Sequence, residues 1–336
     1  METNASIYPY HATWCLTDEE RDHLLRELIR IKVSPYRNPE QFFEVIRTAG
    51  AATRAFCATI RRLRQEADLD VNPVLYLKNL PVEMDLPVFG HDDPVRDKYE
   101  MKVTFVTEAL LSLFALATGT PIIGYRTINN GDMFHDVYLK ESLKHTASQK
   151  SMVSFGFHYD MGFKNVRPDW ANLACVRSAR QNCVSTSVCR NVDIINGLSS
   201  ADLLTLSRPI YTTPPEVVSV VGGEESATPP VKPIYFPDKP WKFEYFEGRT
   251  TTGDTDGMET IRRLDSLLHR AKQHLALEPG DLAAISNNHA MHCREVLSIH
   301  DMDAHRIRWL IKTYNVEDPA EHGANLIARQ SRIADE

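Results

Sequence analysis

Apolar residues recur with a helical period in the first third of the chain and with a strand period in much of the rest. Residues 17–20, Thr-Asp-Glu-Glu, fit a capping box and predict an amphipathic helix that runs through Ile31. Pro39 is typical of a first helical position and predicts a second helix, whose apolar positions continue to Leu63. The apolar run at 74–77 then predicts the first strand.

The pattern changes from helix to strand after a long predicted helix with an apolar face at residues 97–118. Residues 121–240 are typical of short strands and turns, with one short helix at 199–206. A last long helix is predicted at 254–275, before a closing run of strands. The polar, turn-rich stretch at 222–230 predicts an exposed loop.

Strands interleaved with helices and ending in a run of β predict a mainly β fold with flanking helices and a double-stranded β-helix core of the jelly-roll, cupin-like kind. We expect a single domain over residues 1–336. Within it, residues 1–70 would form helical N-terminal support, 72–316 the β-helix core with the helix at 254–275 inserted, and 317–336 a C-terminal tail. A charged content of 25% is ordinary for a globular chain and leaves this picture unchanged.

The charge and cysteine content exclude several classes of partner and compartment. A net charge of −7 argues against a nucleic-acid or anionic-membrane surface, so we expect a small-molecule partner. The sequence shows no apolar stretch long enough for a bilayer and no pattern of a signal peptide. The six cysteines form no C-x-x-C motif, which favours free thiols in a reducing cytoplasm. The pattern does not indicate an oligomeric state.

The candidate chemistry begins with His158-Tyr159-Asp160, which lies in an alternating, strand-like segment. Residues two apart on a strand point to the same side, so His158 and Asp160 can bind one ion together. His292, 132 residues further along, can complete a set of two imidazoles and one carboxylate. That set leaves three positions of an octahedral metal open and favours Fe(II) and oxygen chemistry. An arginine shortly after His292 could hold an acidic co-substrate through paired hydrogen bonds.

Several segments of the chain resemble the clavaminate synthase-like branch of the Fe(II)/2-oxoglutarate oxygenases, which is related to taurine dioxygenase and includes arginine and asparagine β-hydroxylases. They lie in the family's order, at residues 75–82, 131–137, 148–160, 167–175 and 279–314. The resemblance implies an enzyme that binds Fe(II) through His158, Asp160 and His292 and uses 2-oxoglutarate and O₂. It also implies hydroxylation of an unactivated C–H bond in an amino acid, a modified amino acid or a small biosynthetic intermediate, with succinate and CO₂ as co-products.

The resemblance extends to residues around the metal. Arg308 and Thr186 would hold the far carboxylate of 2-oxoglutarate, with Arg306 and Ser185 as their respective rivals. The residues expected to contact the substrate are Asn129, Ser148, Ser151 and Lys312. The family's guanidine-recognising acids would fall at Glu244 and Glu247, which we expect instead on a solvated face.

Departures from the family pattern bear on the substrate. Asp160 replaces the usual glutamate, Lys312 replaces a second arginine, and Ile128-Asn129 replaces a Glu-Gln pair. The last two family positions commonly hold the carboxylate and amine of an amino acid. We therefore expect a substrate other than plain arginine or asparagine.

Alternatives remain at the level of the reaction. Desaturation, cyclisation and epoxidation use the same cofactors and ligands, whereas the intact carboxylate of Asp160 argues against halogenation. A zinc hydrolase could use the same three ligands, but it would need a general base and would have no need for Arg308. A non-catalytic, cupin-like binding protein is the remaining class.

Overall fold

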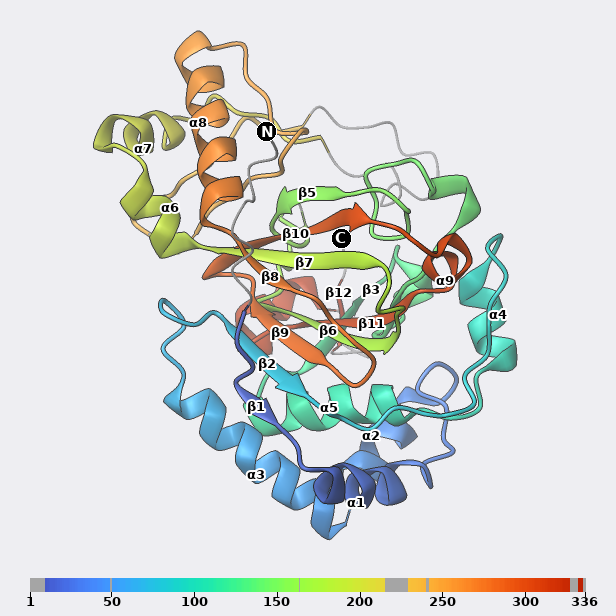
Figure 1. Cartoon of the computed structure of the whole chain (residues 1–336). Coiled ribbons are helices and arrows are strands. Elements are labelled where there is room, and N and C mark those ends of the chain that lie inside the picture. The colour runs from blue at the N-terminus through green and yellow to red at the C-terminus, as the bar shows by residue number, and fades with distance from the viewer. Residues whose placement is uncertain are drawn as a thin grey trace.

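Two β-sheets stacked face to face form the centre of the molecule (Figure 1). The computed structural model describes residues 10–48, 50–162, 164–214, 229–239, 242–326 and 332–334. The larger sheet has eight strands, in the order β1 (Trp14–Cys15), β2 (Val74–Lys78), β9 (Leu282–Ser286), β6 (Trp170–Arg177), β11 (Trp309–Asn315), β3 (Ile122–Tyr125) and β12 (Ile333–Ala334), with β4 (His135–Val137) also paired to β11. The smaller sheet has four strands, in the order β5 (Phe155–His158), β10 (Ala290–Ser298), β7 (Cys183–Arg190) and β8 (Gln273–Leu275).

The alternation of residues along the strands decides which side chains enter the space between the sheets. In β11, Trp309 and Ile311 pack into the core cluster formed with the helices. Leu310 instead joins a second cluster with Val188 of the facing sheet. Leu310 and Lys312 therefore share the inner face of β11, and Arg308, which directly precedes the strand, lines the same space between the sheets.

Helices cover the outer face of the larger sheet (Figure 1). They are α1 (Asp18–Leu28), α2 (Pro39–Arg47), α3 (Ala51–Glu66) and α5 (Val106–Thr118). The predicted capping box of α1 is confirmed, because the Thr17 hydroxyl accepts from the Glu20 amide and the Glu20 carboxylate accepts from the Thr17 amide. Helix α4 (Pro94–Met101) lies at the edge of the sandwich.

Two helices that the periodicity predicted as continuous are each divided in two. The helix predicted from Pro39 to Leu63 ends at Arg47, and α3 begins after Gly50 because Glu27 of α1 accepts hydrogen bonds from the first amides of α3. The helix predicted at 97–118 bends by 98° between α4 and α5. There Lys102 turns inward and donates to the carbonyl of Thr104, a bond that a continuous helix would not allow.

A second group of helices covers the outer face of the smaller sheet: α6 (Asn191–Gly197), α7 (Ser200–Leu206) and α8 (Thr255–Ala271). The helix predicted at 199–206 is therefore confirmed, and the one predicted at 254–275 is confirmed as far as Ala271, after which Gln273–Leu275 form strand β8. The short helices η1 (Asn129–Gly131), η2 (Glu141–Leu143), α9 (Met302–Arg306) and η4 (Pro319–Asn325) lie in the connections and the C-terminal segment. Of the predicted loop at 222–230, residues 222–228 lie outside the described residues.

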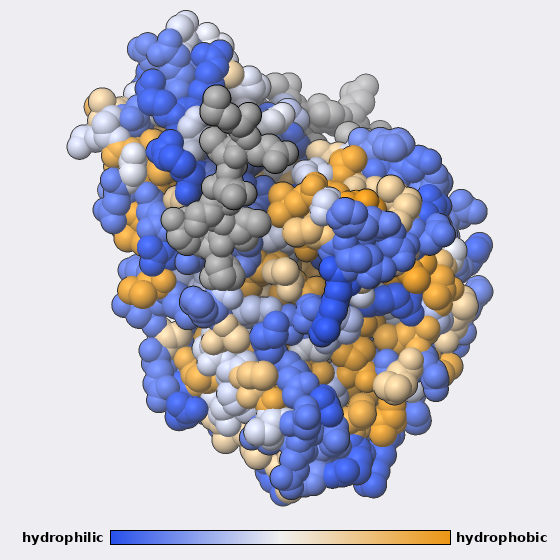
Figure 2. All heavy atoms as spheres, viewed as in Figure 1, coloured by the Kyte–Doolittle hydropathy of each residue, from blue (hydrophilic) through white to orange (hydrophobic). Residues whose placement is uncertain are grey.

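The surface and the cysteines add little to the picture of the fold. Hydrophilic residues cover most of the face in Figure 2, with hydrophobic residues gathered in patches between them. All six cysteines are free thiols. Among the described residues no single helix is long and apolar enough to cross a membrane, and only the bent pair of α4 and α5 reaches that length jointly.

Candidate active site between the two sheets

The two predicted histidines lie directly opposite each other in the smaller sheet. His292 of β10 is the register partner of His158 of the antiparallel strand β5, and Asp160 follows two residues later. One side-chain atom from each of His158, Asp160 and His292 lies within 4.8 Å of the others, and all three residues are buried. Strand pairing thus brings together residues that are far apart in the sequence.

The orientation of His158 is set by its own strand. Its Nδ1 lies 2.8 Å from the carbonyl oxygen of Gly156, to which the protonated nitrogen donates. That bond leaves the lone pair of Nε2 facing the other two residues, as in many metal-binding histidines. The ring also stacks on Phe246 at 5.2 Å, which limits its rotation.

The backbone of Asp160 is held by Asn287, a residue that the sequence analysis did not single out. The Asp160 amide donates to Oδ1 of Asn287 at 3.0 Å, and the Asn287 amide group donates back to the carbonyl of Asp160 at 3.1 Å. Met161, the next residue, has a positive φ of 53°. Strain of this kind in a residue other than glycine is concentrated at functional sites. No sequence pattern identified Asn287, because its partner is distant in the chain.

The side chain of Asp160 has one satisfied oxygen and one unsatisfied oxygen. Oδ1 accepts from Nζ of Lys312 at 2.6 Å. Oδ2 is buried without a hydrogen-bond donor among the described residues and lies 3.1 Å from Nε2 of His292. Burial acts to raise the pKa of Asp160, but Lys312 and the two imidazoles outweigh it and hold the pKa well below its usual range. An ionised carboxylate beside the Nε2 atoms of two imidazoles fits a divalent cation.

A small cavity of about 50 Å³ is lined by His158 and His292 and is strongly cationic. Arg294, Arg308 and Lys312 line it, and no carboxylate is found among its described lining residues. Arg308 makes no ion pair with a described residue, and burial lowers its pKa. Its rival Arg306 instead pairs with Glu141 near the surface. The geometry therefore favours Arg308 over Arg306 as a group that meets an anion.

Thr186 lines the same small cavity, opposite Arg294 in the pairing of β7 with β10. Ser185 points to the other face of β7, where its hydroxyl contacts the carbonyl of Leu275 and the ring of His274. Strand alternation thus separates the two candidates, and only Thr186 faces the cavity.

Arg294 is a second buried guanidinium that the sequence analysis missed. It donates to the carbonyls of Ser148 and Gln149, to the Ser151 hydroxyl, and to the carbonyl of Val153. Burial and the nearby Arg308 lower its pKa to about 9. Arg294 thereby fastens the segment before β5 to β10.

A larger cavity of about 290 Å³ lies on the other side of His158. Of the predicted substrate contacts, Asn129 and Ser148 line this cavity. Ser151 is engaged by Arg294 and Lys312 by Asp160, and neither is among the residues lining the larger cavity. Gln149, Phe155 and His158 line both cavities, so the metal-binding group lies between them.

The expectation of a solvated face for Glu244 and Glu247 is wrong, because their side chains are only 15% and 21% exposed. Glu244 lines the larger cavity and pairs with Lys232 and Lys242. Glu247 accepts from the amide of Phe157 and from His269, which fixes β5 from its outer side. Both burials arise from packing against segments that the local pattern did not place.

Comparison with known proteins gives relatives in sequence and in structure. No family model matches the chain. Clavaminate synthase 2 from Streptomyces clavuligerus is 27% identical over 246 residues, which cover 71% of this chain and 73% of the relative.

Solved structures resemble the whole fold. An asparagine oxygenase in complex with Fe(II), 3-hydroxyasparagine and succinate has a TM-score of 0.79 at 20% identity, covering 96% of this chain and 98% of that one. The non-haem iron oxygenase OrfP, in complex with iron, succinate and (3S)-hydroxy-L-arginine, has a TM-score of 0.74 at 16% identity, covering 96% and 99%. At these identities the structural likeness establishes the fold, which is the predicted jelly-roll with flanking helices.

The fold, the buried His-Asp-His group and the sequence relative define an Fe(II)/2-oxoglutarate-dependent dioxygenase. Within that class, the chain is similar in sequence to clavaminate synthase 2 and in fold to an asparagine oxygenase and to OrfP, in line with the resemblance that its sequence motifs carry. Its cofactor is Fe(II), and its co-substrates are 2-oxoglutarate and O₂.

Proposed function

We propose that this enzyme hydroxylates an unactivated C–H bond of a small molecule of the amino-acid type and releases succinate and CO₂. The observation that carries the proposal is the position of His158, Asp160 and His292 between a small cationic cavity and a larger, separate one. The small cavity suits a dicarboxylate, and the larger cavity suits the substrate. The structural relatives were crystallised with hydroxylated asparagine and hydroxylated arginine.

In this proposal His158, Asp160 and His292 bind the iron. Bound iron, together with 2-oxoglutarate and O₂, supplies the oxidant that removes a hydrogen from the substrate. The unsatisfied Oδ2 of Asp160 is the oxygen placed to bind the metal, whereas Oδ1 is already bonded to Lys312. Retention of this carboxylate leaves no open position for a halide, which supports hydroxylation over halogenation.

Arg308 and Thr186 are assigned to the far carboxylate of 2-oxoglutarate. Both line the small cavity, and Arg308 has no acidic partner among the described residues. A guanidinium and a hydroxyl together can bind both oxygens of a carboxylate. Arg294 adds a second positive charge to the same cavity, and its hydrogen bonds hold the segment that separates this cavity from the larger one.

Lys312 was predicted to bind a substrate carboxylate, but its contact supports another role. Its ammonium donates to Asp160 at 2.6 Å and lines the small cavity. We therefore assign Lys312 to holding the metal-binding carboxylate. The other substrate predictions keep Asn129 and Ser148 at the larger cavity, while Ser151 shapes the site through Arg294.

The proposal is tested by replacing the three metal ligands one at a time with alanine. Each variant should lose the visible charge-transfer band that Fe(II) and 2-oxoglutarate form anaerobically, and should lose iron-dependent succinate production. His289→Ala is the matched control, because His289 lies in the bend before β10 and bonds to Ser286 instead. A ligand variant that kept the band and the activity would remove that residue from the assignment, and a wild-type protein active with zinc alone would favour the hydrolase.

The reaction type, the cellular location and the domain organisation expected from the sequence are further proposals. The larger cavity is compatible with hydroxylation and equally with desaturation, cyclisation or epoxidation, and the mass of the product distinguishes them. A cytoplasmic location stays a prediction, as does the single domain.

A further inference from the structure

Lys150 is a buried lysine at the larger cavity without an acidic partner among the described residues. The residue is only 8% exposed, and it lines the cavity together with Asn129 and His158. Its ammonium donates to Oδ1 of Asn129 at 3.2 Å. No carboxylate within the described part of the chain lies in ion-pair distance of it, and burial lowers its pKa.

Two other lysines of this protein show what burial ordinarily requires. Lys98 contacts the carboxylates of Asp132 and Asp136, and Lys102 contacts those of Glu83 and Glu108. A buried charge is costly unless opposite charges or hydrogen bonds compensate it. Lys150 is nearly as buried as these two but faces a cavity instead of an acid. An anion that enters the cavity would supply the compensation.

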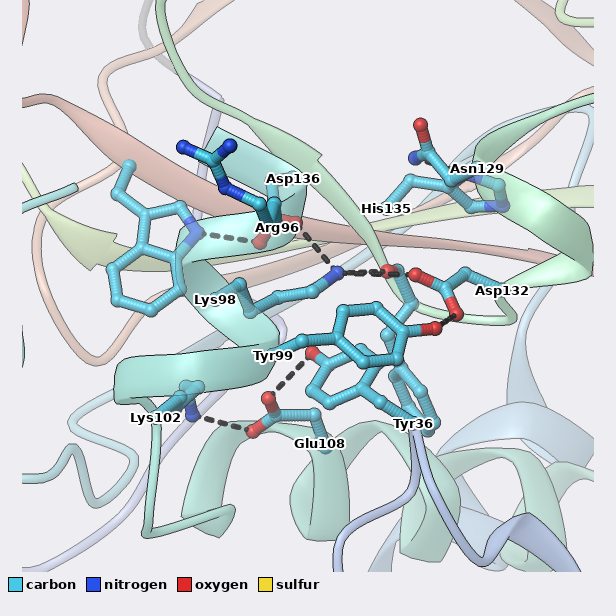
Figure 3. A network of polar contacts seen from close by, with 12 residues as sticks. Tyr36, Arg96, Lys98, Tyr99, Lys102, Glu108, Asn129, Asp132, His135 and Asp136 are labelled. Carbon is cyan, nitrogen blue, oxygen red and sulfur yellow. Dashed lines mark hydrogen bonds and ion pairs between the residues drawn. The ribbon is translucent and has the colours of Figure 1, made fainter. Parts of the chain in front are cut away.

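Asn129 has a strained backbone conformation that positions its side chain beside Lys150. Its φ of 47° lies in the left-handed region, which costs a residue other than glycine free energy. The conformation brings its side chain between Lys150 and His135, whose Nδ1 lies 3.5 Å from the Asn129 amide nitrogen. Figure 3 shows Asn129 and His135 side by side. The amide thus fixes the position of the ammonium from one side.

The acids of the larger cavity are already engaged. Among its described lining residues the carboxylates are Asp160 and Glu244. Asp160 is bonded to Lys312, and Glu244 pairs with Lys232 and Lys242. The lining cations are more numerous: Lys140, Lys150, Lys232 and Arg249. A substrate ammonium would therefore meet more cations than acids, and both acids among these described lining residues are already paired, which is electrostatically unfavourable.

We propose that the substrate is a carboxylic acid whose amine is acylated or absent, and that Lys150, positioned by Asn129, binds its carboxylate. This inference rests on the proposed function and narrows the substrate from amino acids in general to anions without a free ammonium. A single compact ammonium matches one carboxylate. Lys150 becomes the residue that determines this specificity.

The test measures binding to the protein loaded anaerobically with Fe(II) and 2-oxoglutarate, through shifts of the charge-transfer band. The probes are the free protein amino acids, their N-acetyl derivatives and the N-acetyl amides, which lack the carboxylate. We expect N-acetyl acids to bind at millimolar concentration or below, and to bind at least about tenfold more tightly than the free or amidated forms. Lys150→Met should remove the preference for acid over amide.

Lys144→Met is the matched control, because Lys144 lies six residues away and pairs with Glu141 at the surface. It should keep the preference, and thermal unfolding of both variants shows whether either has lost its fold. The inference is overturned if free amino acids bind as tightly as the N-acetyl acids, if no N-acetyl acid binds at millimolar concentration, or if Lys150→Met keeps the preference. A missing charge-transfer band would instead refute the proposed function itself.

Discussion

Two buried ionic regions of this protein have opposite compositions. The first lies between α4, α5 and β4, where Lys98 and Lys102 each contact two carboxylates. Figure 3 shows the two contacts of Lys98 and the contact of Lys102 with Glu108. We call it the closed cluster, and its acids are Glu83, Glu108, Asp132 and Asp136. The second is the active site, where cations outnumber acids in both cavities. Lys150 and Lys312 of the active site are nearly as buried as the lysines of the closed cluster, so the two regions differ in which groups compensate these charges.

The closed cluster is completed by the chain itself. Its acids outnumber its lysines, and burial raises the pKa of Glu108 and of Asp132. The phenol of Tyr36 donates to Glu108, and that of Tyr99 donates to Asp132. Burial alone would lower the pKa of Lys102, but its two glutamates outweigh this and raise it. Every lysine of the cluster is therefore compensated without a ligand.

The closed cluster also supports the site. Asp136 accepts from the indole of Trp309, the residue after Arg308, while its neighbour His135 faces Asn129. Adjacent strand residues point to opposite sides, so β4 carries the closed cluster on one face and the active site on the other. The closed cluster, whose charges are compensated, stabilises the fold. The active site, with its excess of cations and the unsatisfied oxygen of Asp160, is suited to binding ligands.

The largest expected effect comes from breaking the closed cluster. Lys98→Met would leave Asp132 and Asp136 buried without their cation, which should cost about 3–5 kcal/mol of unfolding free energy. Urea denaturation measures the loss. Lys150→Met is the comparison and should keep or raise the unfolding free energy, because no buried acid loses a partner. Equal losses in the two variants would erase the distinction between the regions.

The next effect concerns the small cavity. Arg308→Ala should remove a charge-assisted bond of about 1.5–3 kcal/mol and raise the 2-oxoglutarate requirement by tenfold or more. Arg306→Ala removes only a partly exposed pair with Glu141 and should change this requirement little. Succinate formation over a range of 2-oxoglutarate concentrations measures both. The reverse ranking would return the assignment to Arg306.

Lys312→Met tests the contact with the metal-binding carboxylate. Groups that hold a metal ligand typically contribute about ten- to a hundredfold to metal affinity, so the variant should bind Fe(II) about tenfold more weakly. Anaerobic Fe(II) titration measures the change. If iron affinity stayed as in the wild type and only the substrate requirement rose, Lys312 would have the substrate role that the sequence suggested.

The smallest effect is expected at the pair of His269 and Glu247, which lies outside both regions. The hydrogen bond from His269 to Glu247 raises the pKa of His269, although the His269 side chain is 45% exposed. A raised histidine pKa stabilises the fold below the unfolded pKa of about 6.5 and loses this contribution as the pH rises through the folded pKa. The change should stay below about 1 kcal/mol because solvent screens the pair. Unfolding of His269→Gln should lack this pH dependence, and a steep dependence that persisted in the variant would exclude the pair as its source.

The sequence by itself determined the metal-binding group and the kind of fold. The H-x-D spacing predicted that His158 and Asp160 share one side, and they do so although β5 ends at His158 and Asn287 holds the backbone of Asp160. The ordered motifs around them indicated the family and therefore the partner strand of His292. Short helices with clear caps, such as α1 and α7, were also predictable because their signals are local.

Only the tertiary structure decided which of two nearby candidates faces the site. Arg308 and Arg306 have the same chemistry, but Arg306 ends the short helix α9 and pairs with Glu141, whereas Arg308 directly precedes β11 and lines the small cavity. The sequence did not predict the roles of Lys150 and Lys312 either. Whether the charge of a buried lysine is compensated depends on residues that are distant in the chain. Charge compensation depends on residues that only the fold brings together, whereas the short spacing between His158 and Asp160 can be read directly from the sequence.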